Sequence, residues 1–350
     1  METKQIVRSH SRVRQLLTVA TFVALAALIY GLRKDIGGVI QNLGKVNALA
    51  LLLMIPIEFA NYDAYARMMR SLFATLGKHV AYWPMFKFTL ELNFVNHILP
   101  SGGISGISYF SVRSRSVGIS TAQSTLAQVT KLFLLYASFQ PLLIIGLFFL
   151  AARGHVNNLV MLVASSLITL VVVGTVIAIY IIDSRQRINR SLTYITRGIN
   201  RLIHIFRRKT PETINIANAQ KTFDELHDNY VIYKNNWRAL KAPFFYTMLA
   251  NATEVAAVYV VYIAFGQYVN VGAVILAYAV ANFAGLISVL PAGIGVYEVL
   301  MTGVLTATGI PVEVSIPVTI MYRFVNMFIQ LTPGYFFYQR AMKNGLSVKA

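Results

Sequence analysis

Residues 158–182 read NLVMLVASSLITLVVVGTVIAIYII, a run of 25 residues without a charged side chain. About 20 apolar residues are enough for a helix to cross the hydrocarbon layer of a bilayer. In lipid, only helices and closed barrels satisfy their own backbone polar groups, and this run lacks the alternation of polar and apolar residues that barrel strands show. The stretch therefore predicts a membrane-spanning helix.

Similar runs recur along the chain. With 56% hydrophobic residues, 13% charged residues and a mean hydropathy of +0.60, the composition differs from that of a water-soluble protein. Segment 82–112 is also apolar, but charges, a proline and glycines interrupt it, so we expect a broken or re-entrant helical hairpin there. We predict an all-α fold in which residues 1–350 form a single membrane domain, a polytopic helical bundle. Its eight expected spans are 16–32, 47–65, 126–151, 158–182, 243–265, 272–290, 296–312 and 314–338.

The charge is strongly basic, with 31 Lys and Arg against 13 Asp and Glu. In a membrane protein such an excess reflects basic cytoplasmic loops, so we expect no DNA partner. If both termini are cytoplasmic, the inner segments hold 25 basic residues, the outer loops four and the spans two. We expect the first run to stay as an uncleaved span, because it continues past the small-residue site at Ala24-Leu25-Ala26. We therefore predict a multi-pass protein of the cell membrane with both termini inside.

Segment 183–242 is the one long polar stretch, with twelve Lys and Arg against five Asp and Glu. Apolar residues recur at helical spacing opposite a basic face up to Phe206, Pro211 ends that pattern, and a second helix is expected over Ala217–Trp237. We predict a basic cytoplasmic helical hairpin that lies on anionic lipid. The alternative is a docking site for RNA or a partner protein.

Two glycine-rich loops share an unusual pattern, an Asn on a helix followed by Leu-Pro and closely spaced glycines. They are Asn93–Gly106 and Asn282–Glu298. Because proline and glycine break helices, and broken helices at membrane depth line polar cavities, matched breaks of this kind indicate a transporter's substrate site. Both loops start from the cytoplasmic side in the expected topology, whereas a strict inverted repeat would place them on opposite sides.

Ionisable residues inside spans are costly and usually face a cavity or a partner. They are Glu58, Asp63, Glu91, Lys131, Glu254, Glu298 and Arg323. Arg323 is explained either by pairing with Glu298 or by holding a phosphate. The candidate substrate-binding residues are Asn93, Asn96, Pro100, Gly102, Gly103, Gly106, Lys131, Asn282, Pro291, Gly293, Gly295, Glu298 and Arg323.

Enzyme and metal signatures do not stand out in the sequence. The chain has no cysteine and its six histidines are scattered, so we expect no metal site and no cofactor. No Gly-x-Ser-x-Gly elbow, phosphate-binding loop or His-Glu-x-x-His motif is present.

Three features together resemble the lysylphosphatidylglycerol synthase transmembrane-region family, also called flippase-like. They are Asn-x-x-Leu-Pro-x-Gly at 96–102, Pro-x-Gly-x-Gly-x-x-Glu at 291–298 and an arginine within the last long span. The family often has an Arg-x-x-Asp-like pair after the first glycine loop, where this chain has Lys131 without the acid. The resemblance implies a membrane module that moves lipids or lipid-linked headgroups across the bilayer. Full-length synthases add a soluble C-terminal transferase domain, which we expect to be missing here because only twelve residues follow Tyr338.

The leading interpretation is a flippase-like protein for an anionic, aminoacylated or polyprenyl-phosphate lipid, so a membrane phospholipid or lipid-linked headgroup is the expected partner. One alternative is a phosphatidylglycerol lysyltransferase, which would connect the protein to antimicrobial-peptide resistance. The other is a non-transporting membrane scaffold. A homo-oligomer and a separate transferase are the protein partners left open.

Overall fold

The computed structural model describes residues 46–98, 104–152, 154, 158–206, 216–287 and 295–343. Every regular element in these ranges is a helix, which confirms the all-α class expected for a polytopic membrane protein. The expected first span at 16–32 lies outside them. The helices are α3 (Ala48–Leu52), α4 (Met54–Thr75), α5 (Tyr82–Ile98), α6 (Ile104–Arg115), α7 (Thr121–Ala152), α8 (Asn158–Ile182), α9 (Arg185–Phe206), α10 (Ile216–Asn235), the 3-10 helix η1 (Trp237–Leu240), α11 (Lys241–Ala264), α12 (Val271–Ile287), α13 (Val296–Ala307) and α14 (Val312–Lys343).

Four helical stretches of the described chain are long and apolar enough to cross a membrane. These are α7, α8, η1 with α11, and α14, and they contain or closely match the expected spans 126–151, 158–182, 243–265 and 314–338. Their mostly apolar sequences explain why they form long helices in lipid, where every backbone group must be satisfied internally. The expected span 47–65 is divided between α3 and α4, and α4 continues to Thr75.

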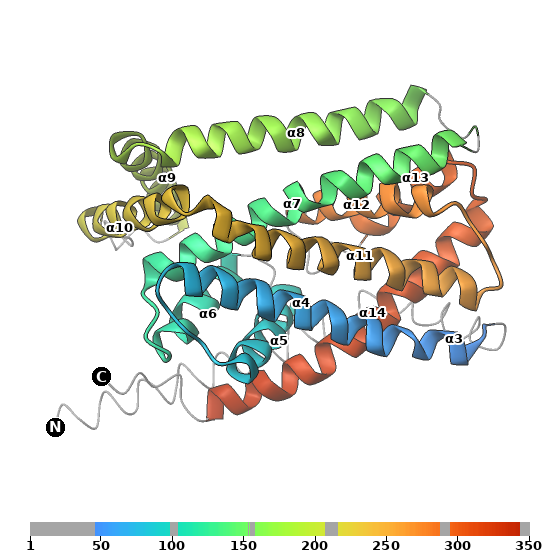
Figure 1. Cartoon of the computed structure of the whole chain (residues 1–350), viewed down its shortest axis with the longest axis horizontal. Coiled ribbons are helices and arrows are strands. Elements are labelled where there is room, and N and C mark those ends of the chain that lie inside the picture. The colour runs from blue at the N-terminus through green and yellow to red at the C-terminus, as the bar shows by residue number, and fades with distance from the viewer. Residues whose placement is uncertain are drawn as a thin grey trace.

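The long helices run back and forth between two ends of the bundle (Figure 1). At one end lie α9 and α10, and we call it the basic end. The end of α4 is also here, because the Tyr233 hydroxyl of α10 donates to the Leu72 carbonyl at 3.0 Å. At the opposite end, the Asn47 N–H before α3 donates to the carbonyl of Ala264, the last residue of α11, at 2.9 Å.

The helices α5 and α6 form the expected broken hairpin. Since α4 ends and α7 begins at the basic end, and the connections 76–81 and 116–120 are short, the pair leaves this end and returns to it. At about 1.5 Å per residue, α5 is about 26 Å long and α6 about 18 Å, so neither crosses a full bilayer. The end of α5 and the start of α6 therefore lie inside the bundle.

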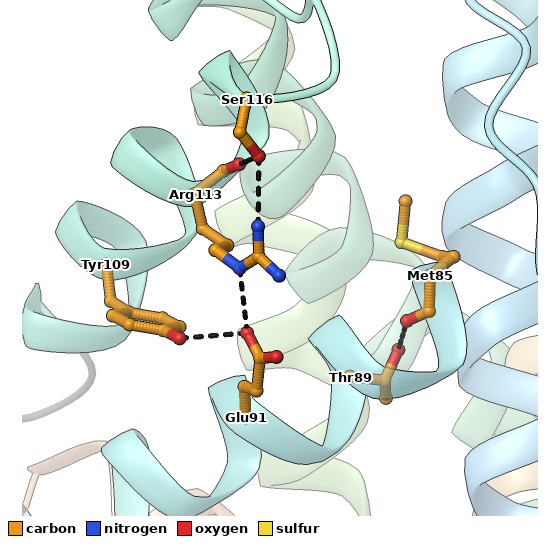
Figure 2. Close-up of polar contacts among 6 residues, drawn as sticks. All are labelled: Met85, Thr89, Glu91, Tyr109, Arg113 and Ser116. Carbon is orange, nitrogen blue, oxygen red and sulfur yellow. Dashed lines mark hydrogen bonds and ion pairs between the residues drawn. The ribbon is translucent and has the colours of Figure 1, made fainter. Parts of the chain in front are cut away.

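A buried ion pair holds this hairpin together (Figure 2). Glu91 of α5 accepts hydrogen bonds from the Tyr109 hydroxyl of α6 at 2.8 Å and from Arg113 Nε at 3.1 Å. The Arg113 guanidinium also lies over the Phe88 ring, 4.3 Å from its centre. Because the Glu91 side chain is almost fully buried, loss of Arg113 would leave a buried charge without its cation.

A second broken hairpin, α12 and α13, replaces the two separate spans expected at 272–290 and 296–312. Its connections, 265–270 and 308–311, join it to the end of α11 and the start of α14, both at the opposite end. The 12 residues of α13 cover only about 18 Å. The N-cap of this helix is Gly295, whose φ of 86° is a conformation that glycine adopts readily. The two hairpins thus enter from opposite ends, the arrangement of an inverted repeat.

The segment 183–242 folds into α9, α10 and η1. The first helix is Arg185–Phe206, and the second, expected over Ala217–Trp237, is Ile216–Asn235. The hairpin is seated on the bundle by a buried cluster that joins Ile188, Leu226 and Tyr233 to residues of α4 and α7. Its cytoplasmic location and its contact with lipid stay predictions.

The packing of α12 against α7 yields a stability prediction. A Cβ at Gly272 would lie 2.1 Å from the Gly146 carbonyl oxygen, whereas one at Gly303 of α13 would meet nothing within 4 Å. We expect Gly272→Ala to force the helices apart at a cost of about 1–3 kcal/mol, and Gly303→Ala to be neutral or slightly stabilising. Thermal unfolding of the purified protein in detergent checks this. Equal melting temperatures for the two variants would contradict the close approach.

Candidate functional site

Helix α14 carries a polar stripe through the middle of the bundle. Tyr322, Asn326 and Gln330 are spaced by four residues, so they lie on one side of the helix, and all three are buried. Gly334 lets α5 approach this helix, since a Cβ there would lie 2.8 Å from the Leu90 carbonyl oxygen. The helix also packs against α13, and it therefore contacts both broken hairpins.

The stripe contacts a group of buried polar residues that we call the carboxylate cluster. Gln330 Nε2 donates to Glu58 of α4 at 2.8 Å, while Gln330 Oε1 accepts from Asn93 of α5 at 2.9 Å. Asn93 also donates to the Tyr62 hydroxyl of α4. The cluster consists of Glu58, Tyr62, Asn93, Glu254, Tyr322, Asn326 and Gln330.

A second carboxylate, Glu254 of α11, completes the cluster. It accepts a hydrogen bond from the Tyr322 hydroxyl at 2.9 Å. Asn326 lies between the two acids, and its side-chain amide fits in two orientations. In one it donates to Tyr322 at 3.1 Å, and in the other it donates to Glu58 at 2.7 Å. The two carboxylates are thus connected through neutral donors.

The cluster is electrostatically unusual because its two acids, Glu58 and Glu254, take part in none of the ion pairs among the described residues. Glu58 is 1% exposed, and Glu254 is within electrostatic reach of it. An isolated buried carboxylate is expensive, so hydrogen bonds from amides and hydroxyls must replace the water that each acid loses. Such groups inside a membrane bundle usually mark a path or a binding site for a polar or charged species.

An ion pair lies on the neighbouring side of α14. The Arg323 guanidinium contacts Glu298 Oε1, and Glu298 Oε2 accepts from the Gly295 N–H at 2.7 Å. Glu298 therefore caps the start of α13 in addition to binding the arginine. The Arg323 guanidinium also lies over the Tyr297 ring, 4.6 Å from its centre.

Arg323 of this ion pair also interacts electrostatically with the last turn of α5. His97, in the last turn of α5, has its Nδ1 2.9 Å from the Asn93 carbonyl oxygen and is within electrostatic reach of Arg323. The end of α5 and the start of α13 therefore both contact α14.

The structure brings together some of the residues predicted from the sequence. Gly295, Glu298 and Arg323 are in contact, so the ion pair that the sequence left as one of two explanations for Arg323 is present. Asn93 belongs to the carboxylate cluster. Residues Pro100, Gly102, Gly103, Pro291 and Gly293 lie outside the described residues.

Other candidates have local roles in the structure. A Cβ at Gly106 would lie 1.7 Å from Asn96 Oδ1, so Gly106 makes room for that side chain at the α5–α6 contact. Asn282 donates to the Tyr278 carbonyl of its own helix at 3.1 Å. The Lys131 ammonium lies 4.8 Å from the centre of the Tyr65 ring. These contacts of Asn96, Asn282 and Lys131 do not join them to Glu298 or Arg323.

Sequence reasoning missed most of the carboxylate cluster. It singled out Glu58 and Glu254 as costly charges but did not place them in the candidate site, and it passed over Tyr322, Asn326 and Gln330. The four-residue spacing of these three polar residues within an apolar helix was the available signal. Among the residues that the structure describes, no group of three or more His, Asp or Glu side chains could hold a metal ion.

The cluster yields a second stability prediction. Gln330→Leu would leave Glu58 and Asn93 each short of a partner, at about 1–3 kcal/mol for every buried group affected. The matched control is Thr332→Val, two residues along, because the Thr332 hydroxyl is exposed and bonds only the Phe328 carbonyl of its own helix. We expect a clear fall in melting temperature for the first variant and little change for the second. A neutral Gln330→Leu would show that the cluster does not stabilise the fold.

Comparison with known proteins connects this architecture to a family. The family model described as the lysylphosphatidylglycerol synthase transmembrane region matches residues 15–334. A UPF0104 membrane protein of Methanocaldococcus jannaschii is 23% identical over 326 residues, which are 91% of this chain and 92% of that protein. One of Methanothermobacter thermautotrophicus is 29% identical over 103 residues, so the match spans only 31% of that protein and 29% of this chain.

A further relative, a UPF0104 membrane protein of Pyrococcus horikoshii, is 21% identical over 193 residues, 53% of this chain and 55% of that protein. The family match covers most of the 350 residues, including both broken hairpins and Arg323. The chain therefore belongs to the lysylphosphatidylglycerol synthase transmembrane-region family.

Proposed function

We propose that this protein moves the polar headgroup of a membrane lipid across the bilayer while the acyl chains stay in lipid. The observation that carries the proposal is the pair of short hairpins that enter from opposite ends and both contact α14, the first at its polar stripe and the second at Arg323. A headgroup crossing at this position would exchange water for polar side chains instead of hydrocarbon. The family name, which refers to a lipid, is in keeping with this role.

The chemistry of the two polar groups favours a substrate that carries a phosphate. Arg323 offers a planar fork of donors that binds a phosphate in a bidentate manner, in competition with Glu298. The carboxylates Glu58 and Glu254 would suit the ammonium group of an aminoacylated headgroup. The substrate class is therefore an anionic, aminoacylated or polyprenyl-phosphate lipid, and any aminoacyl transfer would be the work of a separate partner.

For orientation, we propose that the basic end faces the cytoplasm of a cell whose plasma membrane holds the protein. The segment 183–242 at this end carries twelve of the 31 Lys and Arg residues. Basic loops are retained on the cytoplasmic side during membrane insertion. On this topology the α12–α13 hairpin enters from the outside.

The topology can be tested with single cysteines, because the native chain has none. We expect Tyr268→Cys, exposed between α11 and α12, to react with an impermeant thiol reagent added to intact cells. Glu225→Cys, exposed on α10, should react only after the cells are opened. The reverse pattern would invert the proposed orientation.

Lipid movement can be tested with purified protein in vesicles that contain a fluorescent phosphatidylglycerol. An impermeant reductant bleaches the outer leaflet, so movement appears as further bleaching. Arg323→Lys keeps the charge but loses the bidentate fork, and we expect the rate to fall about tenfold or more. Thr332→Val, which is exposed on the same helix, should match the wild type.

A double variant separates binding from folding at this position. Arg323→Leu with Glu298→Gln removes both charges, while the glutamine side-chain oxygen can still accept from the Gly295 N–H. We expect this variant to insert and fold, since neither charge is left unpaired, yet to move no lipid. If it moves lipid at the wild-type rate, Arg323 does not serve the substrate and the proposed site is wrong.

A further inference from the structure

Helix α9 follows directly on α8, which is long and apolar enough to cross a membrane. It begins three residues after the end of α8, a 25-residue helix without charges whose apolar side chains are largely exposed. The Arg187 guanidinium stacks on Tyr180, near the end of α8, 4.0 Å from the centre of its ring. This contact joins the start of α9 to the end of α8. Figure 1 shows α9 turned across the end of α8 instead of continuing its line.

One side of α9 is occupied by α10 through an antiparallel ladder of polar contacts. Arg185 pairs with Asp228, Asn189 Nδ2 donates to Asp224 at 2.7 Å, and Gln220 Nε2 donates to the Thr193 hydroxyl at 3.5 Å. The three α9 residues are spaced by four, so they form a single stripe. The ladder uses two acidic side chains of α10.

A further contact involves Asp183, which lies between α8 and α9. Asp183 pairs with Lys234 of α10, and this hydrogen bond holds the pKa of the Asp183 carboxyl below its ordinary value. Asp183, Asp224 and Asp228 thus already have partners. Arg190 and Arg197 are exposed on the side of α9 away from the ladder, and they take part in none of the ion pairs among the described residues.

The side away from α10 also exposes apolar surface. Tyr194 is 79% exposed and Ile195 is 53% exposed, which is unusual for large apolar side chains in contact with water. Ile188 and Leu192 lie on the same side of the helix as Ile195, and both pack on the bundle. Ile195 therefore continues an apolar side that packs on protein at the start of α9 and is exposed further along, as far as the described residues go.

We propose that the outer face of α9, defined as Arg190, Tyr194, Ile195 and Arg197, binds the anionic headgroups of the membrane in which the protein sits. The two arginines supply charge that is complementary to anionic lipid, and Tyr194 and Ile195 enter the boundary between headgroups and acyl chains. The structure thus divides the basic hairpin in two, with α9 on lipid and α10 holding it in place through the ladder. This inference does not depend on the proposed lipid movement.

The test uses full-length protein with one cysteine, in nanodiscs of phosphatidylcholine alone or with phosphatidylglycerol added. Ile195→Cys carries an environment-sensitive fluorophore, and the matched control is Glu225→Cys on α10, an exposed residue whose side chain lies outside the ladder. A nitroxide on the lipid headgroup measures proximity. We expect strong quenching at position 195 only in the anionic discs, and weak quenching at position 225 in both.

Charge variants identify the interaction. Arg190→Gln and Arg197→Gln are each introduced with the cysteine at position 195. Each should lower about fivefold the ratio of molecules whose labelled α9 contacts the lipid headgroups to molecules whose labelled α9 does not. Lys221→Gln, a loss of one exposed charge on α10, should leave the ratio unchanged. Ionic strength near 1 M should weaken the quenching as well, because it shortens the screening length to about 3 Å. Unchanged melting temperatures show that the variants remain folded.

Two results would overturn the proposal. Equal quenching at position 195 in neutral and anionic discs would show that charge does not select the lipid. A label that stays unquenched in both discs and becomes protected only when RNA is added would assign the outer face of α9 to nucleic acid instead.

Discussion

Helix α13 begins inside the bundle, and this start is the constraint on which the central arrangement depends. The first N–H groups of a helix have no partner within the helix, and in a membrane interior water cannot supply one. Glu298 satisfies one of these groups by accepting from Gly295. Its negative charge then needs a cation, which Arg323 provides from α14. A broken helix, a carboxylate and an arginine are therefore required together.

The same reasoning explains why the carboxylate cluster is spread over four helices. Two buried acids that take part in none of the described ion pairs need several neutral donors, and one helix face cannot supply them all. The donors come from α14 and α5, which approach closely because Gly334 has no side chain. The hydrogen bonds between α5 and α14 thus depend on a glycine at the point where the two helices pack. The short hairpins leave the middle of the bundle to polar groups, and the long helices cover its outside with apolar ones.

Much of the fold could be predicted from the sequence, because hydrophobic length reports directly on the thickness of the bilayer. The long apolar helices and the break within 82–112 were found in this way. The second hairpin was not, since an apolar stretch of 17 residues followed by one of 12 has the same hydropathy whether it crosses twice or turns back. Only the positions of α11 and α14 show that both of its ends lie on the same side.

By itself the sequence determined the membrane class, the helical content and the presence of costly charges such as Arg323, because these follow from composition and local spacing. The tertiary structure decided which charges meet. Gln330 and Glu58 are 272 residues apart along the chain, yet they share a hydrogen bond. No local pattern contains that information, since it depends on how α4, α5, α11 and α14 pack. The opposite entry of the two hairpins has the same origin, because direction across a membrane is set by all the preceding crossings.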